Sequence, residues 1–461
     1  MDINQILVIL MFVTFIGILL IGYPIPFALG GTAVLFVGVG YIADNYFGAF
    51  TGIDLNYFGL VITRIYKTMT NWVLVSLPIF IFMGLMLDKS GIAERLMNSS
   101  QKLFGKVRGG LAITVTFVGV LLAASTGIVG ASVVLLGLLS LPAMLNQGYS
   151  KTLALGTVAS AGTLGILIPP SIMLVVMGDQ LSLSVGDLFL GAVFPGLMLA
   201  GMYVVFILIF AFFNPKSAPL PEDLEPVSWK VVKDVILNVI PPFGLIVAVL
   251  GSIFAGIATV TEASAVGALG SVLLAVMFKK FNFEVLKDVL YGTFNTTAYI
   301  FGIFVGATAY ALVLRGLGGD EVISEVLTSL PFGPTGTILV ILGVVFLLGF
   351  FLDWVEITLI VLPLLSPVIP HLGLNINGYG VLENPNLLWF VMLVAMTLQT
   401  SFLTPPVGFS LFYLKGVTPP NITLGDIYKG VIPFIIIQLL SLFFLIIFPE
   451  LITWLPATIY K

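Results

Sequence analysis

Two short stretches decide how this chain folds: GILIPPSIML (Gly165–Leu174) and SFLTPPVGFS (Ser401–Ser410). Each places a Pro-Pro pair inside a long apolar run, and the first prolines of the two pairs, Pro169 and Pro405, are 236 residues apart. Proline lacks the backbone N–H that a helix needs, and its ring clashes with the carbonyl four residues earlier. Each pair therefore predicts a helix that breaks in the middle.

The composition predicts an all-α polytopic membrane protein. Of the 461 residues, 59% are hydrophobic and only 9% are charged, whereas soluble domains carry about 25% charged residues. Several apolar runs reach the roughly 18 residues of a membrane-spanning helix, and they lack the alternation of a membrane β-strand. The absence of cysteine excludes disulfides, and no basic block indicates a nucleic-acid partner.

The apolar runs recur in the same order in two halves of the chain. An apolar stretch such as Leu111–Met144 has 34 residues, whereas two full spans need about 40. Each such interrupted stretch is therefore predicted to be a re-entrant hairpin, which is allowed where protein or water covers its tip. The predicted parts are two halves (1–213 and 234–461), a cytoplasmic linker (214–233), two hairpins (about 111–146 and 337–370) and two broken helices (about 152–180 and 386–416).

The distribution of charge predicts the orientation. Lys and Arg concentrate in connectors such as Lys89–Arg108 and Lys279–Lys287, whereas Asp179–Asp187 and Asp320–Glu325 contain neither. Because cytoplasmic loops are enriched in Lys and Arg, the former connectors are expected inside, and the latter segments and both termini outside. The two halves then run in opposite directions, and an inverted repeat with a broken helix in each half is typical of secondary transporters.

The breaks predict two cation sites. Each Pro-Pro pair frees carbonyl oxygens of the preceding turn, those of Gly165 and Ile166 and those of Ser401 and Phe402, and a small hard cation such as Na⁺ satisfies stranded oxygens. Nearby hydroxyls, glycine turns and intramembrane acids would complete the sites. The first predicted site consists of Ser125, Gly127, Ser132, Thr163, Gly165 and Ile166. The second consists of Asp353, Glu356, Thr400, Ser401 and Thr404.

The half-helix after each break predicts an anion site. It begins at Ser171 in the first half and at Val407 and Gly408 in the second. Its first N–H groups and the positive end of its dipole suit a carboxylate. The substrate is therefore expected to bind between the breaks formed by Pro169, Pro170, Pro405 and Pro406.

Each assignment has a structural alternative. The breaks would be simple kinks if neighbouring Ser or Thr satisfied their carbonyls, and STGIVGAS (Ser125–Ser132) would be a packing seam of small residues. Asp353 is also placed to cap a helix. Glu262, three residues after Thr259, fits a capping box, and His371, the single histidine, is expected at a solvent-exposed helix end.

Several long motifs make the chain resemble a known family, the large membrane subunit of tripartite ATP-independent periplasmic (TRAP) transporters, DctM or SiaM. The likeness covers nearly the whole chain, and within the family it leans towards the mannitol/chloroaromatic or 2-oxoacid branch. The motifs are KSGIAERLMNSSQKLFGKVRGGLA (Lys89–Ala112), STGIVGASVVLLGLLSLPAML (Ser125–Leu145), SAGTLGILIPPS (Ser160–Ser171), GIATVTEASAVGAL (Gly256–Leu269) and FLDWVEITLIVLPLLSPV (Phe351–Val368).

The resemblance implies Na⁺-driven uptake of a small organic acid across the inner membrane of a bacterium or archaeon, by an elevator motion. It implies two partners, a small DctQ-like membrane subunit on a separate chain and a DctP-like periplasmic binding protein. It adds Leu352 to the second cation site and implies no cofactor besides Na⁺ as the coupling ion.

Two other functions compete with this hypothesis. A stand-alone Na⁺- or H⁺-coupled carrier of organic anions would need no binding protein. A membrane enzyme or scaffold would show no flux, but the sequence contains no HExxH, Walker or GxSxG motif. The chain is therefore predicted not to be an enzyme.

Overall fold

The fold is all-helical in the part of the chain that the computed structural model describes, residues 3–104, 107–126, 129–221, 229–405 and 408–460. The helices of the first half are α1 (Ile3–Leu20), α2 (Ile25–Phe47), α3 (Leu55–Met69), α4 (Trp72–Lys89), α5 (Ile92–Phe104), α6 (Gly110–Thr126), α7 (Val129–Asn146), α8 (Lys151–Thr163), η1 (Leu164–Ile166), α9 (Ile172–Leu181), α10 (Val185–Phe213) and η2 (Pro215–Ser217).

The second half begins with α11, which starts at Trp229, inside the range predicted as a linker. Its helices are α11 (Trp229–Phe254), α12 (Val260–Met277), α13 (Phe283–Gly316), α14 (Gly319–Thr328), α15 (Gly333–Leu348), α16 (Trp354–Glu356), the π-helical η3 (Ile357–Val361), α17 (Leu362–Leu365), η4 (Ser366–Leu372), α18 (Pro385–Leu403), α19 (Phe409–Val417), α20 (Leu424–Ile447) and α21 (Glu450–Ile459).

The helices confirm a polytopic membrane protein. Within the described residues, 11 helical segments are long and apolar enough to cross a bilayer. Helices suit that environment because every backbone polar group finds its partner within the segment. One of the 11 is α7, which forms one arm of the first predicted hairpin. Because α7 alone is long enough to span the membrane, length does not decide whether the hairpin is re-entrant; the depth of the hairpin tip in the membrane does.

Polar caps mark many of the helix starts. The Asp54 carboxylate accepts from the Tyr57 N–H at 2.7 Å, which starts α3. The capping box predicted at Thr259 and Glu262 is confirmed at the start of α12. A second box, Thr423 with Asp426, starts α20. These side chains satisfy N–H groups that the first turn of a helix leaves without a partner.

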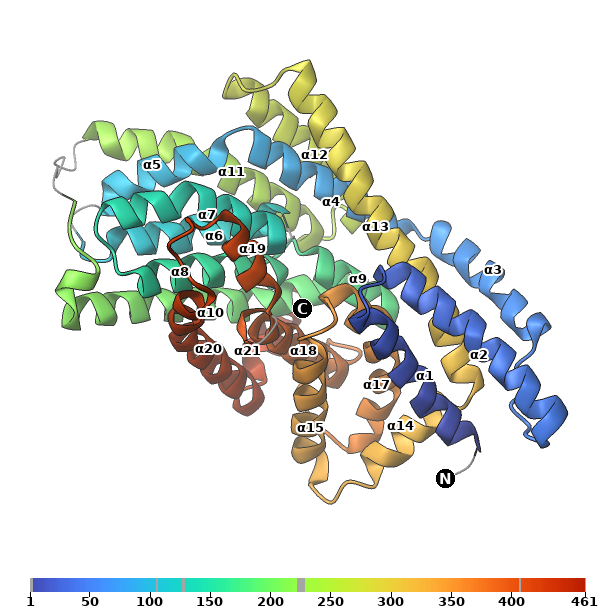
Figure 1. Ribbon diagram of the computed structural model, residues 1–461. Coiled ribbons are helices and arrows are strands. Elements are labelled where there is room, and N and C mark those ends of the chain that lie inside the picture. Colours follow the sequence, from blue (N-terminus) through green and yellow to red (C-terminus); the bar gives the residue numbers. More distant parts are fainter. Residues whose placement is uncertain (1–2, 105–106, 127–128, 222–228, 406–407, 461) are drawn as a thin grey trace.

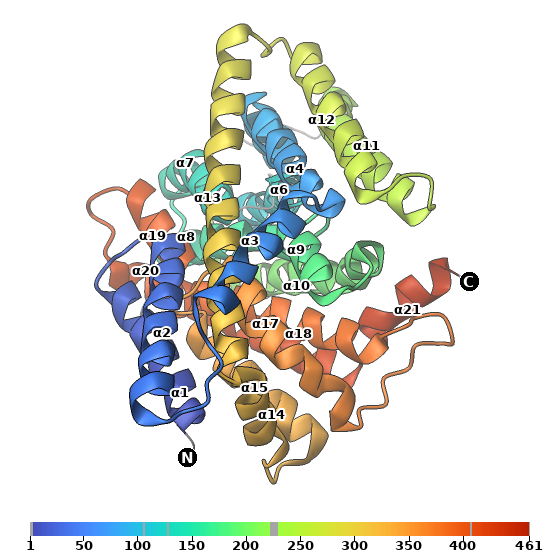
Figure 2. The same ribbon diagram turned by 90° about the vertical axis from the view of Figure 1, so that its right-hand side faces the viewer.

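The long helix α13 lies against α1–α4 at one side of the molecule. It contacts α2, α3 and α4, and Figures 1 and 2 both show it running beside α2. The Tyr57 hydroxyl of α3 donates to the Leu312 carbonyl of α13 at 3.2 Å. Residues Phe283–Gly316 form one continuous helix because the polar run Asn295–Thr297 contains neither Gly nor Pro to break it.

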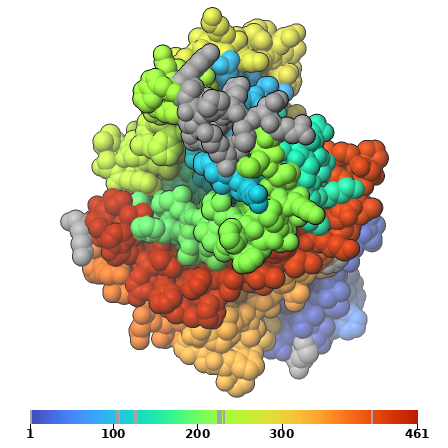
Figure 3. Space-filling view, turned by 90° about the vertical axis from the view of Figure 1, so that its left-hand side faces the viewer, coloured from blue at the N-terminus to red at the C-terminus, as the bar shows by residue number. Residues whose placement is uncertain are grey.

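The interrupted stretches and broken helices form the rest of the molecule. In the first half, α6 and α7 pack on each other and on α8. In the second, α15 packs on α18. On the face seen in Figure 3, α10 lies beside α20 and α21, coloured green and red.

Close approach of α8 and α20 depends on two glycines. A Cβ on Gly156 would lie 2.1 Å from the Gly430 carbonyl oxygen, and a Cβ on Gly430 would lie 2.5 Å from the Thr152 carbonyl oxygen. Both obstacles are backbone atoms and cannot rotate away. Small residues at such crossings let two membrane helices pack tightly.

We expect Gly156→Ala to destabilise the protein by about 2 kcal/mol, because the added methyl forces α8 away from α20. Thermal unfolding of the detergent-solubilised protein measures the effect. The matched control is Gly201→Ala in α10, where a Cβ would meet nothing within 4 Å and where alanine favours the helix. Equal midpoints for the two variants would contradict the assignment.

Candidate functional site

The first Pro-Pro pair lies in a buried interruption between α8 and α9. Helical structure ends at Ile166 and resumes at Ile172, and Thr163, Ile166 and Ser171 are fully buried. The Ser171 hydroxyl donates to the Ile166 carbonyl at 2.6 Å and accepts from the Leu174 N–H at 3.5 Å. One serine thus joins the end of one half-helix to the start of the next.

The second break uses the same device. Helix α18 ends at Leu403 and α19 begins at Phe409. The Ser410 hydroxyl donates to the Phe402 carbonyl at 2.7 Å. Phe402 stands three residues before Pro405, just as Ile166 stands three residues before Pro169. Equivalent carbonyls are therefore bound by a serine hydroxyl in both breaks.

These bonds correct the expectation that the breaks strand their carbonyl oxygens. The Ile166 and Phe402 carbonyls each have a serine donor, and the Ser401 carbonyl accepts from the Thr404 N–H at 3.2 Å. A carbonyl oxygen has a second lone pair, so each can still bind a cation. Ser171 uses its hydroxyl inside the break, and the predicted substrate contact through the first N–H groups of α9 stays a prediction.

Part of the substrate site predicted on the second half-helix lies outside the described residues, which exclude Pro406 and Val407. Gly408 is the N-cap of α19 and has φ +48°. A Cβ there would lie 2.8 Å from the Leu411 side chain and 3.0 Å from the Phe402 carbonyl oxygen. Gly408 is thus required by the turn, whatever it binds.

The first interrupted stretch packs directly against the first break. A Cβ on Gly162 would lie 3.0 Å from the Val133 nitrogen of α7, and one on Gly119 of α6 would lie 2.8 Å from the Ala161 Cβ. Ser132, the neighbour of Val133, is buried. Ser132 and Thr163 thus come from segments that touch, whereas Gly127 and the Ser125 side chain lie outside the described residues.

The second interrupted stretch meets the second break in the same manner. The Ser401 hydroxyl of α18 donates to the Phe346 carbonyl of α15 at 3.1 Å, and a Cβ on Gly349 would lie 2.7 Å from the Ser401 side chain. The hydroxyls of Thr400 and Thr404 also donate to carbonyls, of Met396 and Thr400, at 3.3 and 2.6 Å.

The two predicted acids differ in their surroundings. Asp353 is half-buried and caps α16, where its carboxylate accepts from the Trp354 N–H at 2.7 Å. Asp353 therefore caps a helix, as was considered from the sequence. Glu356 is fully buried, and Leu352 is 1% exposed. Among the described residues, neither Glu356 carboxylate oxygen has a hydrogen-bond partner. A buried carboxylate is very unfavourable unless a cation or proton compensates it.

Each half-helix after a break contacts the interrupted stretch of the other half. Helix α9 touches α16, η3 and α17, and α19 touches α7 and α8. The Tyr413 ring of α19 packs on Gly130 of α7, at 2.9 Å from the Cβ position. Tyr413 and Tyr299 also lie within electrostatic reach of Asp353. The segments that carry the predicted sites of the two halves therefore contact each other.

Two buried polar residues here were missed by sequence reasoning. Gln399, one residue before Thr400, is fully buried, and within the described ranges neither its amide nitrogen nor its amide oxygen has a hydrogen-bond partner. The same part of the chain offers no partner to the buried Thr157 hydroxyl of α8. A glutamine inside the apolar run of α18 was the available signal. His371, as predicted, is exposed.

The chemistry of this region suits a hard monovalent cation more than a transition metal. In the described part of the chain, no group of three or more His, Cys, Asp or Glu residues could hold a metal ion. Hydroxyls, carbonyls and one unpaired carboxylate are oxygen donors, which hard cations prefer.

Comparison with known proteins agrees with this architecture. The chain is 31% identical to the C4-dicarboxylate TRAP transporter large permease protein DctM of Vibrio cholerae, over 97% of each chain. It is 27% identical to the ectoine TRAP transporter large permease protein TeaC of Halomonas elongata, over 98% of this chain and 99% of that one. Its fold is similar to that of the YdaH transporter of Alcanivorax borkumensis, with a TM-score of 0.59, 12% identity and 88% and 91% coverage.

The family match extends over almost all of the chain. Residues 12–451 match the family described as tripartite ATP-independent periplasmic transporter, DctM component. This family consists of transporter permeases and not of enzymes, as the sequence predicted. The specific branch within the family is not resolved by relatives of 26–31% identity. The chain belongs to the DctM family, the large permease subunits of TRAP transporters.

Proposed function

We propose that this chain is the permease of a Na⁺-coupled importer of a small organic acid. It would receive the acid from a periplasmic binding protein and work beside a small DctQ-like membrane subunit. The family description, tripartite and periplasmic, supports both partners. The Vibrio cholerae relative is named for C4-dicarboxylates, which makes a dicarboxylate the first substrate to test.

The main observation in favour of Na⁺ coupling is the unpaired carboxylate of Glu356. Within the described residues, neither of its oxygens has a hydrogen-bond partner, and its helix α16 contacts α13 and α9, the half-helix after the first break. A sodium ion would supply the missing positive charge. The hydroxyls of Thr163, Ser401 and Thr404 donate to carbonyls, so their oxygen lone pairs stay available to bind an ion.

We further propose that the halves 1–213 and 234–461 form an inverted repeat that works as an elevator. The matching serine-to-carbonyl bonds of the two breaks support the repeat. So do the helices after the breaks, since α10 begins with Ser184 and Asp187 and α20 begins with Thr423 and Asp426. The interrupted stretches and broken helices would move together against α1–α4 and α11–α13.

We expect Glu356→Gln to raise the Na⁺ concentration for half-maximal uptake at least about tenfold, or 1.4 kcal/mol, because the neutral amide cannot balance the ion. Thr163→Ala tests the first site in the same assay. The assay measures succinate uptake into proteoliposomes with both partner proteins, at fixed pH.

The matched control is Glu450→Gln, which removes an exposed carboxylate at the start of α21. The Na⁺ dependence should then remain that of the unmodified protein. If Glu356→Gln behaves like this control, Glu356 is not part of a sodium site. Uptake that proceeds without the binding protein would favour the stand-alone carrier.

Replacing Pro169 and Pro170 together by alanine should abolish uptake, because a continuous helix would remove the ends that face the site. The matched control is Pro433→Ala, since Pro433 lies inside the unbroken helix α20. We expect the control to keep most of its uptake rate. Normal uptake by the double variant, at equal protein in the membrane, would mean that the first break has no function in transport.

The proposed location is the inner membrane of a bacterium or archaeon, with both termini outside. The chain has no cysteine, so single cysteines can report sidedness. A membrane-impermeant thiol reagent should label Ser324→Cys in α14 from outside and Ser217→Cys in η2 only after the membrane is opened. Labelling of both from the same side would overturn the topology.

A further inference from the structure

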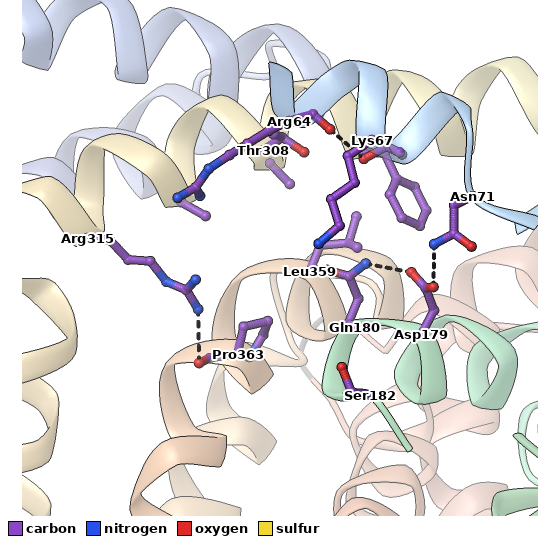
Figure 4. A pocket seen from close by; sticks show the side chains of 14 residues that line it. Arg64, Lys67, Asn71, Asp179, Gln180, Ser182, Thr308, Arg315, Leu359 and Pro363 are labelled. Atoms are coloured by element: carbon purple, nitrogen blue, oxygen red, sulfur yellow. Dashed lines mark hydrogen bonds between the residues drawn. The ribbon is translucent and has the colours of Figure 1, made fainter. Parts of the chain in front are cut away.

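A cavity of about 580 Å³ lies between two groups of helices. Helices α3 and α13 form one wall, and the end of α9 with the η3–α17 segment forms the other (Figure 4). Its volume falls in the range of small-molecule sites. It lies apart from the breaks, and its lining includes Arg64, Lys67, Thr308, Arg315, Asp179 and Gln180.

The cavity carries an excess of positive charge. Asp179 is its single acidic lining residue among those described, and its two carboxylate oxygens accept from the Asn71 and Gln180 amides. Arg315 forms an ion pair with Asp320 at 3.3 Å and donates to the Pro363 carbonyl at 3.3 Å. In the described part of the chain, neither Arg64 nor Lys67 has an ion-pair partner.

The geometry of α3 places both unpaired cations at this cavity. Arg64 and Lys67 are three residues apart, so they lie on one face of the helix. Figure 4 shows the Lys67 amino group directed into the cavity, towards Gln180 and Leu359. Like charges on one face of a helix repel each other, and a bound anion would relieve that repulsion.

The position of these cations in the predicted topology is unusual. The loop before α3 and the acidic helix α14 after α13 both belong to the predicted outer side. Lys and Arg are generally depleted there, yet three of the chain's 18 Lys and Arg residues line this one cavity. Arg315 is paired with Asp320, but Arg64 and Lys67 have no matching acid in the described part of the chain, and this excess of positive charge indicates a ligand of negative charge.

We propose that this cavity binds the carboxylate of a small organic anion on the outer side, before the anion reaches the helix breaks. The proposal rests on the proposed function for its side of the membrane and its direction. Arg64, Lys67 and Arg315 belong to the wall that stays still in that scheme, whereas Asp179 and Gln180 belong to the moving wall. A cationic cleft of this kind raises the local concentration of anions and their rate of entry.

Because the chain has no cysteine, a single Thr308→Cys substitution provides a probe inside the cavity. In outside-facing proteoliposomes of phosphatidylcholine, without Na⁺, we expect an anionic methanethiosulfonate reagent to react about tenfold faster than a cationic one. Adding Arg64→Gln and Lys67→Gln should bring the two rates close together. Adding Lys216→Gln, an exposed lysine of η2, should leave the ratio unchanged.

The ligand is tested on the same variant. Succinate should slow the labelling of Thr308→Cys, and its neutral diamide, succinamide, should not. The protection should vanish with Arg64→Gln and Lys67→Gln. Equal reaction rates for the two reagents, or absence of protection by saturating succinate, would overturn the proposal. So would equal protection by phosphatidylglycerol in the vesicles without succinate, since the occupant would then be a lipid headgroup.

Na⁺-dependent uptake, measured in the same vesicles with the binding protein, separates this inference from the proposed function. If uptake does not require Na⁺ but succinate still protects Thr308→Cys, the coupling mechanism fails and the anion site stands. If uptake requires Na⁺ and the double Gln variant keeps both the normal KM for succinate and the protection, the anion site fails and the coupling stands.

Discussion

Buried backbone carbonyls must find a partner, and this constraint shapes the centre of the molecule. Each Pro-Pro pair removes helical N–H donors from an apolar segment, and the first pair is buried. Ser171 and Ser410 restore a donor, at the equivalent carbonyls of Ile166 and Phe402. A hydroxyl fills only one lone pair of each oxygen, so the chain stabilises the break and still leaves the oxygen able to bind an ion.

The contacts of the half-helices explain why two breaks are needed. Helix α9, which follows the first break, packs on the interrupted stretch of the second half, and α19, which follows the second, packs on that of the first. Gly130 admits the Tyr413 ring, and Gly349 admits Ser401. The two breaks are therefore held in one assembly, and displacement of either half-helix would disturb the opposite interrupted stretch.

Features set by neighbouring residues, such as helix breaks and caps, could be predicted from the sequence. Contacts between residues that are distant in the sequence could be found only in the structure. Proline chemistry located both breaks, and the spacing of Thr259 and Glu262 gave a capping box that the structure contains. The partner of the Phe402 carbonyl could not be read in advance, because Ser410 lies eight residues away across the break. The same holds for the crossed half-helices and for the cavity cations, whose neighbours come from distant segments.

The proposed cycle uses two sets of unpaired charges of opposite sign, one on the moving group and one on the stationary group. Among the residues that the structure describes, Glu356 on the proposed moving group has no positive partner, and Arg64 and Lys67 on the proposed stationary group have no negative one. A carboxylate that leaves the stationary cations enters a region where charge is poorly solvated. Sodium ions bound beside Glu356 would supply positive charge that travels with the anion. In the proposed cycle, coupling to Na⁺ would follow from electrostatics, since the moving group would cross most easily when ions and substrate are bound together.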